Sequence, residues 1–179
     1  VLASVMLGNG GIFCWYSYIS PTLTRLAGVP VEALTVMMVL AGVGMVIGNI
    51  VGGELSDRFG PGKTGRGLEI TIFVSLVLIA LTADSKWCLV PLMMIACGCL
   101  FAVSPPQQLL LLRFSKGGEL MGGAMVQLAF NFGNAVGAWL GGLPISETDS
   151  STYHYPAAIG AAMAVGGIIC YIVFCKRYK

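Results

Sequence analysis

The stretch that decides the fold runs from Gly52 to Arg66 and reads GGELSDRFGPGKTGR. Only 10% of the whole chain is charged, and long apolar runs precede and follow this stretch. Its charged residues are nevertheless dense: Glu54, Asp57, Arg58, Lys63 and Arg66. A glycine-punctuated cluster of charges between two apolar runs predicts a connector at the boundary between membrane and water, because charged side chains are costly in the hydrocarbon core.

The composition of the chain favours a membrane protein. It is 56% hydrophobic with a mean hydropathy of +0.86, whereas a soluble domain is about 45–50% apolar. Crossing a bilayer takes about 20 helical residues. The runs without charge are 1–24, 33–53, 70–83, 87–112, 120–146 and 150–175. We therefore expect an all-α membrane protein with six transmembrane helices, at residues 2–20, 33–53, 68–84, 87–112, 119–143 and 156–175.

Two spans have unusual features. The run at 70–83 is short, and we expect Glu69 and Lys86 to reach water from its two ends. This placement leaves no acidic side chain deep in any span. The fourth span contains Pro105-Pro106, which predicts a kink, since each ring removes a backbone donor and clashes with the preceding turn.

Basic residues indicate the orientation of the chain. Eight of the ten fall after the second span, after the fourth span or in the tail, namely Arg58, Lys63, Arg66, Arg113, Lys116, Lys176, Arg177 and Lys179. Arg25 and Lys86 fall on the opposite side. Because cytoplasmic loops are enriched in Lys and Arg, we expect both termini in the cytoplasm and the chain in the inner or plasma membrane. Val1 begins within a span, so we expect residues 1–179 to be the C-terminal part of something longer.

Glycines recur every four residues in two of the spans. The second span carries Gly44, Gly48 and Gly52, and the fifth carries Gly133, Gly137 and Gly141. Such stripes let helix backbones approach closely. They serve either packing within these six helices or docking of helices from elsewhere. Each stripe lies on the second helix of a triplet, which favours a 3+3 internal repeat.

Polar residues inside the spans are candidates for a solute path. Asn9, Phe13 and Tyr16 share a face of the first span, and Gln127, Asn131 and Asn134 share one of the fifth. Ser104, Gln107 and Gln108 lie beside the proline pair. An amide facing lipid is costly, so these side chains should point into the bundle, either as hydrogen-bonding links between helices or as the lining of a path. Amides, hydroxyls and aromatic faces suit a small neutral hydroxylated solute.

The stretch that opens this section resembles the cytoplasmic signature of the major facilitator superfamily. In that signature a glycine is followed after three residues by an aspartate and a basic residue, then by a further glycine and basic residues. Here it is carried by Gly53, Asp57, Arg58, Gly60 and Lys63. Six helices with both termini inside match one half of such a transporter. The start at Val1 favours the C-terminal half, helices seven to twelve.

A narrower resemblance covers most of the chain. Residues 8–18, 98–107, 116–122 and 129–138 resemble the AraJ-type permeases of the drug:proton antiporter branch, described as sugar or arabinose efflux proteins. One departure is Pro61-Gly62, where many members place basic residues.

The resemblance implies a function for each of these features. It implies alternating-access efflux of a sugar or a small amphiphilic compound, with an N-terminal six-helix half as partner and protons as a coupling ion. The glycine-striped helices would face the other half, and Asp57 would close a cytoplasmic gate against a helix N-terminus there. The alternative for Asp57 is an exposed ion pair with Arg58. The proton carrier would lie in the missing half.

Other classes of function have little support. His154 is the only histidine and falls in an outside loop, and no cluster has metal-ligand spacing. A net charge of +2, with basic residues at membrane borders, does not favour nucleic acid. We expect neither an enzyme nor a metal or cofactor. The second hypothesis is a self-standing six-helix protein that homodimerises through its glycine stripes and does not transport.

Overall fold

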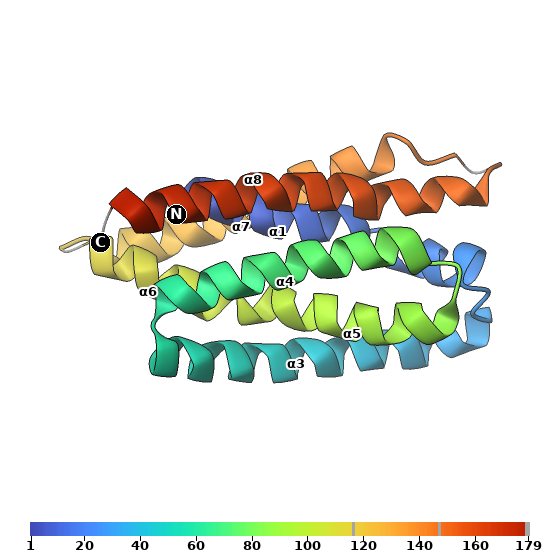
Figure 1. The fold of residues 1–179 in the computed structure, drawn as a ribbon, viewed down its shortest axis with the longest axis horizontal. Coiled ribbons are helices and arrows are strands. Elements are labelled where there is room, and N and C mark those ends of the chain that lie inside the picture. Colours follow the sequence, from blue (N-terminus) through green and yellow to red (C-terminus); the bar gives the residue numbers. More distant parts are fainter. Residues whose placement is uncertain (116, 147, 178–179) are drawn as a thin grey trace.

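The computed structural model describes residues 1–115, 117–146 and 148–177. These residues form helices and no strand. The elements are α1 (Leu2–Tyr16), α2 (Ile19–Pro21), η1 (Thr22–Leu26), η2 (Val31–Ala33), α3 (Leu34–Phe59), α4 (Pro61–Thr82), α5 (Lys86–Ala102), α6 (Ser104–Phe114), α7 (Glu119–Gly142), η3 (Ser150–His154) and α8 (Tyr155–Arg177). The long helices lie side by side along one axis, and α1 begins at the same end of the bundle where α8 finishes (Figure 1). The expected all-α class is confirmed.

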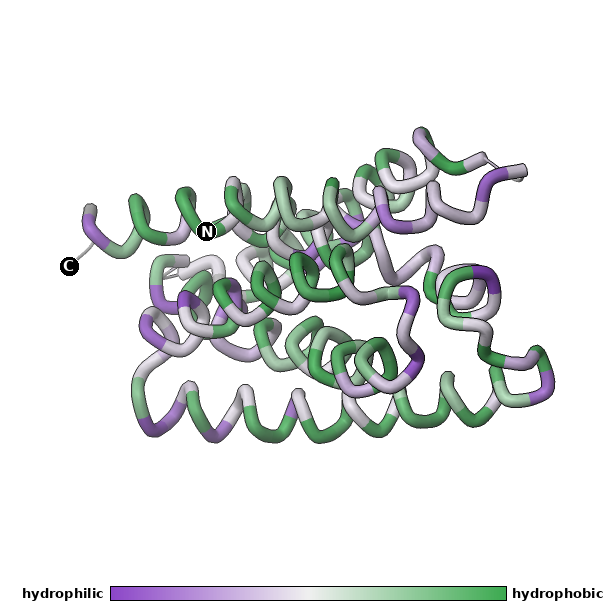
Figure 2. Tube along the Cα trace, turned by 45° about the vertical axis from the view of Figure 1, so that its right-hand side comes forward, coloured by the Kyte–Doolittle hydropathy of each residue, from purple (hydrophilic) through white to green (hydrophobic). Residues whose placement is uncertain are grey.

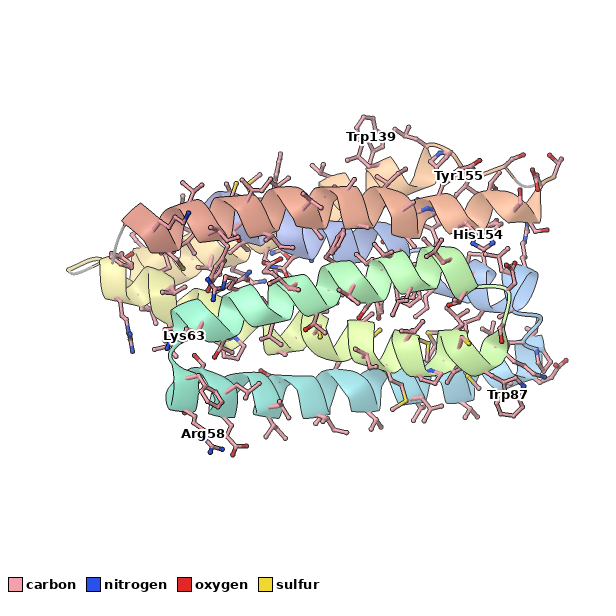
Figure 3. The ribbon with its side chains drawn as sticks, in the orientation of Figure 1. Arg58, Lys63, Trp87, Trp139, His154 and Tyr155 are labelled. Carbon is pink, nitrogen blue, oxygen red and sulfur yellow. The ribbon has the colours of Figure 1, made fainter. Side chains whose placement is uncertain are left out.

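Four helical segments are long and apolar enough to cross a membrane: Val31–Phe59, Pro61–Thr82, Lys86–Phe114 and Ser150–Lys176. The first and fifth expected spans are not among these four segments. They correspond to α1, which has 15 residues, and to α7, which has 24 residues and carries amides. Figure 2 shows hydrophobic residues along the helices and hydrophilic ones gathered toward the two ends of the bundle. Exposed Trp87 and Tyr155 lie at one end, and Arg58 and Lys63 at the other (Figure 3).

The helix contacts repeat between two triplets. The first triplet is α1, α3 and α4, and the second is α5 with α6, α7 and α8. In each triplet the first helix packs against the second and third helices of the other: α1 contacts α7 and α8, while α5 contacts α3 and α4. The two third helices, α4 and α8, pack on each other. Exchanging the triplets reproduces these contacts, which is the arrangement expected of a 3+3 repeat.

Both glycine stripes are used inside the chain. A Cβ added at Gly44, Gly48 or Gly52 would overlap the backbone of α5, at Met94, Gly98 and Ala102 respectively. A Cβ at Gly133, Gly137 or Gly141 would overlap the backbone of α1, at Met6, Gly10 and Cys14. The stripes therefore leave no room for a helix from another half or another copy, and their interpretation as docking or dimerisation faces is wrong.

The stretch from Gly52 to Arg66 is almost entirely helical. We expected a connector after residue 53, but α3 continues to Phe59 and α4 begins at Pro61. Gly60 alone joins them, with a φ of 84° that favours glycine. Proline suits the first position of a helix, where its missing N–H has no acceptor. Across this tight turn Thr64 Oγ1 donates to the carbonyl oxygen of Leu55 at 2.8 Å.

The fourth span is broken where its two prolines predict a kink. α5 ends at Ala102 and α6 begins at Ser104, with Val103 between them. The backbone hydrogen bonds that remain near the break run from Val103 N to Cys99 O and from Gln107 N to Val103 O. The break gives Gln107 a place on a separate helix segment facing the interior.

Candidate functional site

A buried polar network joins three helices in the interior of the bundle. Asn9 Nδ2 on α1 donates to Gln107 Oε1 on α6 at 3.1 Å. Gln107 Nε2 in turn donates to Glu69 Oε1 on α4, also at 3.1 Å. The three side chains are 0%, 1% and 0% exposed, in that order. The fold therefore links two amide side chains, on two different helices, to a carboxyl group on a third helix by hydrogen bonds.

Glu69 corrects two expectations. We expected this residue to reach water from the end of a short span, and no acidic side chain to lie deep in the bundle. Because α4 already begins at Pro61, Glu69 lies about two turns inside the helix. It shares the inward face with Gly65, Ile72 and Leu76, all buried. That i, i+4, i+7 spacing was readable from the sequence and would have placed Glu69 inward.

Two glycines make room for the Glu69 carboxyl group. A Cβ added at Gly8 of α1 would overlap both of its oxygens. A Cβ at Gly167 of α8 would lie 3.3 Å from Oε2 and would also press on the backbone of Gly8. Four helices thus enclose this one side chain: α1, α4, α6 and α8.

The network is not fully satisfied. Glu69 Oε2 and Asn9 Oδ1 are buried and have no hydrogen-bond partner among the described residues. The hydrogen bond that Glu69 does accept comes from a neutral amide, that of Gln107. An unpaired acceptor costs about 1–3 kcal/mol when it is buried, so this arrangement calls for a donor or a bound ion.

The predicted path residues of α7 lie apart from this network. Gln127 and Asn131 are exposed on α7, and Asn134 is half-buried with its Oδ1 unpartnered among the described residues. The structure therefore brings Asn9 and Gln107 together but leaves the three amides of α7 on another face. Gln108 is exposed and donates through Nε2 to Ser104 Oγ at 3.1 Å, within α6.

Aromatic side chains join α1 to α7. The ring centroid of Phe13 lies 5.3 Å from that of Tyr16 and 6.4 Å from that of Phe130. The rings are tilted or edge-on, the arrangements that aromatic pairs prefer. Phe13 and Tyr16 are half-buried, so one side of this aromatic group remains open to a ligand or a neighbouring helix.

The signature residues lie at one end of the bundle. Asp57 and Arg58 are exposed, and the Arg58 guanidinium lies over the Phe59 ring, 5.3 Å from its centroid. Figure 3 shows Arg58 and Lys63 at this end. A Cβ on Gly53 would meet nothing within 4 Å. A cavity of about 330 Å³ opens nearby, lined by residues that include Lys63, Arg66, Arg113 and Phe174.

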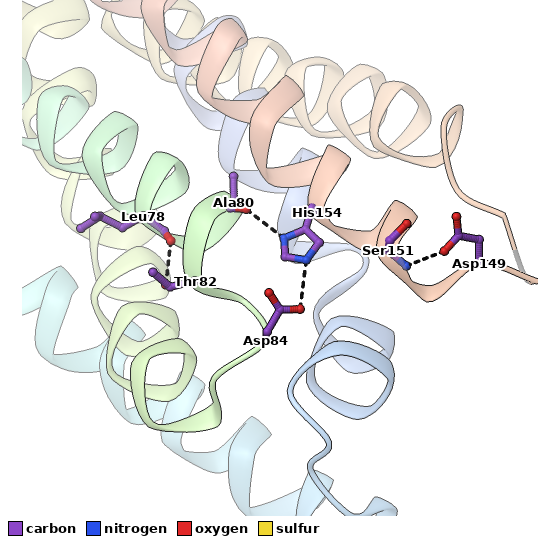
Figure 4. Close-up of polar contacts among 7 residues, drawn as sticks. All are labelled: Leu78, Ala80, Thr82, Asp84, Asp149, Ser151 and His154. Atoms are coloured by element: carbon purple, nitrogen blue, oxygen red, sulfur yellow. Dashed lines mark hydrogen bonds and ion pairs between the residues drawn. The ribbon is translucent and has the colours of Figure 1, made fainter.

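The opposite end is held by His154. Its Nδ1 lies 2.8 Å from the carbonyl oxygen of Ala80, and its Nε2 lies 3.2 Å from Asp84 Oδ1 (Figure 4). These contacts tie η3 to the end of α4. Nearby, Asp149 Oδ1 accepts a hydrogen bond from Ser151 N at 2.9 Å, and hydrogen bonding from Ser151 holds the pKa of Asp149 below its usual value.

Comparison with known proteins gives three informative relatives. The chain is 37% identical over 182 residues to a transporter named AraJ from Escherichia coli K12, covering 100% of this chain and 45% of the relative. It is 34% identical over 178 residues to the inner membrane transport protein YdhP of the same strain, covering 99% and 44%. It is 32% identical over 169 residues to the MFS-type transporter YtbD of Bacillus subtilis 168, covering 91% and 41%.

The chain matches no protein-family profile and no solved structure. It spans less than half the length of each relative named above. All three relatives are transporters that match nearly the whole of this chain, and the chain itself folds into membrane-compatible helices. By sequence similarity and by fold, the chain therefore belongs to the MFS-type transporters, the major facilitator superfamily.

Proposed function

We propose that the chain is the C-terminal half of a secondary transporter that exports a small neutral solute, a sugar or a small amphiphilic compound, by alternating access. The observation that carries the proposal is the exposed amide pair of Gln127 and Asn131 in the middle of α7. An amide is costly against lipid. These two side chains therefore suit a water-filled path or the face of another helical unit.

The aromatic group beside them supports the same path. Phe13 and Tyr16 are half-buried on α1, and Phe13 contacts Phe130 of α7. Their ring faces and the Tyr16 hydroxyl suit the apolar faces and hydroxyl groups of a sugar. Path residues on both α1 and α7 would be close to one solute. An N-terminal six-helix half would close the path from the other side.

The gate proposal rests on Asp57. This carboxylate is exposed at the end of α3, where it is free to approach the positive N-terminus of a helix in the other half, an attraction of about 0.3–1 kcal/mol at an exposed site. Gly53, Gly60 and Lys63 would shape the same gate. We propose that this end faces the cytoplasm, because most of the basic residues lie there.

The experiment begins with the coding sequence upstream of Val1. An in-frame extension of six further spans supports the proposal, and a start codon directly before Val1 contradicts it.

The second experiment measures transport: the whole protein is reconstituted in liposomes and its efflux is measured over sugars and amphiphilic compounds. Replacing Gln127, Asn131 or Asn134 by Leu should change efflux without loss of expression. Leu128→Ile, on the exposed side of the same helix, is the matched control, and unaltered efflux in all three variants contradicts the path.

A further inference from the structure

We propose that the pocket formed by Glu69, Gln107 and Asn9 is a proton-binding site, with the proton on Oε2 of Glu69 in the conformation described. The coupling ion would then bind within this half of the transporter. The transport consequence rests on the proposed function, but proton binding itself does not. The geometry points to this site independently of any solute.

The first step is electrostatic. Moving an unpaired carboxylate into a low-dielectric interior carries a large desolvation cost, and one hydrogen bond from a neutral amide such as Gln107 recovers only part of that cost. The hydrogen bond therefore does not offset the cost. Protonation removes the charge, and with it the largest part of the cost of burying this side chain.

The second step considers which charges face Glu69. On α8 the nearby titratable group is Tyr171, which is fully buried against Gly65, one turn before Glu69, and donates to the carbonyl oxygen of Pro61 at 3.0 Å. On α1 the facing groups are Asn9 and the backbone of Gly8, and on α6 the facing group is Gln107. None of these carries a positive charge.

The remaining charges near α4 are turned elsewhere. Arg66, on α4 itself, is exposed and lines the cavity with Lys63 and Arg113. The charged residues of α3, which are Glu54, Asp57 and Arg58, are exposed, as is Lys86 at the start of α5. Cys97 and Cys99 of α5 are buried thiols. His154 of η3 is bonded to Asp84 at the far end of α4.

The third step identifies the occupant. Little space is left around the carboxyl group, because a Cβ at Gly8 would overlap it and a Cβ at Gly167 would lie 3.3 Å from Oε2. A metal cation with its ligand shell needs more space and more oxygens than this pocket offers. No group of three or more His, Cys, Asp or Glu residues able to hold a metal occurs in the described part of the chain. A proton needs neither space nor a ligand shell.

The fourth step is release of the proton. Gln107 lies on α6, which is separated from α5 at Val103, so a rotation of α6 about this break would pull the amide from Glu69 and admit water. The O–H bond of the carboxylic acid then breaks, the electron pair stays on Oε2, and water accepts the proton. The carboxylate left behind is stable only while it is hydrated. Proton release and helix movement are therefore coupled.

Infrared spectroscopy of the 179-residue chain in lipid nanodiscs tests proton binding directly. A protonated carboxyl group gives a C=O stretching band distinct from carboxylate bands, and deuterium shifts it. At pH 7 the wild type and the control variant Glu54→Gln, which lacks an exposed carboxylate, should show the band. Glu69→Gln, whose amide oxygen can still accept from Gln107, should lose it. Absence of the band in the wild type, or its persistence in Glu69→Gln, overturns the proposal.

Two further arms make the outcome decisive. Replacing potassium by sodium should leave the band unchanged, and its loss in sodium would identify a metal-cation site instead. If Glu69→Gln does not fold, ¹³C-labelled glutamate in the wild type should shift the band, because Glu69 is the buried glutamate among the described residues. An unshifted band would overturn the assignment.

The transport arm is separate. In the whole transporter, solute efflux by wild type and Glu54→Gln should rise at least tenfold when an inward proton gradient is imposed. Efflux by Glu69→Gln should not respond to the gradient. A full response in Glu69→Gln contradicts coupling at this site, whereas no efflux by the wild type contradicts only the proposed function and leaves the infrared result standing.

Discussion

The two triplets of this bundle share their packing and differ in their chemistry. Each has a glycine-striped second helix, α3 or α7, whose backbone meets the first helix of the other triplet. Their third helices differ, because α4 carries a buried carboxyl group at Glu69, whereas α8 has no acidic residue and presents Gly167 to it. Features found in both triplets are those that the fold requires. The feature found in one of them is where we locate a chemical function.

The largest expected effect tests the shared packing. Gly48→Ala and Gly137→Ala each place a Cβ against a facing backbone, and we expect each to lower the free energy of unfolding by about 1–3 kcal/mol. Thermal unfolding in detergent, followed by circular dichroism, measures the change.

The matched control for this packing is Gly42→Ala, also on α3, where a Cβ would meet nothing within 4 Å. It should gain stability, by up to about 1 kcal/mol, because alanine favours helix over glycine. A Gly48→Ala variant as stable as Gly42→Ala would show that the stripes are not essential to packing.

The second effect concerns the feature that the triplets do not share. Gln107→Leu removes the link between Asn9 and Glu69 and leaves buried polar atoms without partners, which costs about 1–3 kcal/mol. Gln108→Leu is the adjacent control, because Gln108 is exposed and bonds only within α6. Equal unfolding temperatures for the two variants would contradict the importance of the network.

The contrast between the triplets also shows what the sequence could predict. The proline break and the close helix packing at the glycine stripes follow from spacing along one helix, and both are found. Of the six expected spans, four correspond to segments that are long and apolar enough to cross a membrane. Glu69 lies at the edge of an apolar run, which predicts the end of a span, whereas its spacing with Ile72 and Leu76 favours the inward face of the helix. Its burial depends on Gly8 and Gly167, which lie on other helices. The hydrogen bond between Asn9 and Gln107, which are 98 positions apart, likewise depends on how separate helices pack, so spacing along one helix does not predict it.

A third and smaller effect concerns the C-terminal end of α4, which lies opposite the signature residues. His154→Ala removes the contacts to Ala80 and Asp84 (Figure 4). Asp84 is 72% exposed, so the pair is screened by water and contributes about 1 kcal/mol or less. A double-mutant cycle with Asp84→Ala measures the coupling. A coupling of several kcal/mol would mean that this end, rather than the buried network, holds the two triplets together.

The smallest effect separates a surface carboxylate from the buried one. Hydrogen bonding from Ser151 holds the pKa of Asp149 below its ordinary value. A carboxyl group with a depressed folded-state pKa stabilises the fold above its unfolded pKa, and this contribution is lost as the pH falls through the folded value. Chemical-shift titration should find the pKa of Asp149 below its ordinary value, and closer to that value in Ser151→Ala, which removes the hydroxyl donor. An unchanged pKa in that variant would assign the shift to the backbone N–H alone.

The same carboxylate also gives an internal comparison for the buried site. Because Asp149 is ionised at neutral pH and Glu69 is proposed to be protonated there, the two carboxyl groups should give opposite infrared signatures in the same sample.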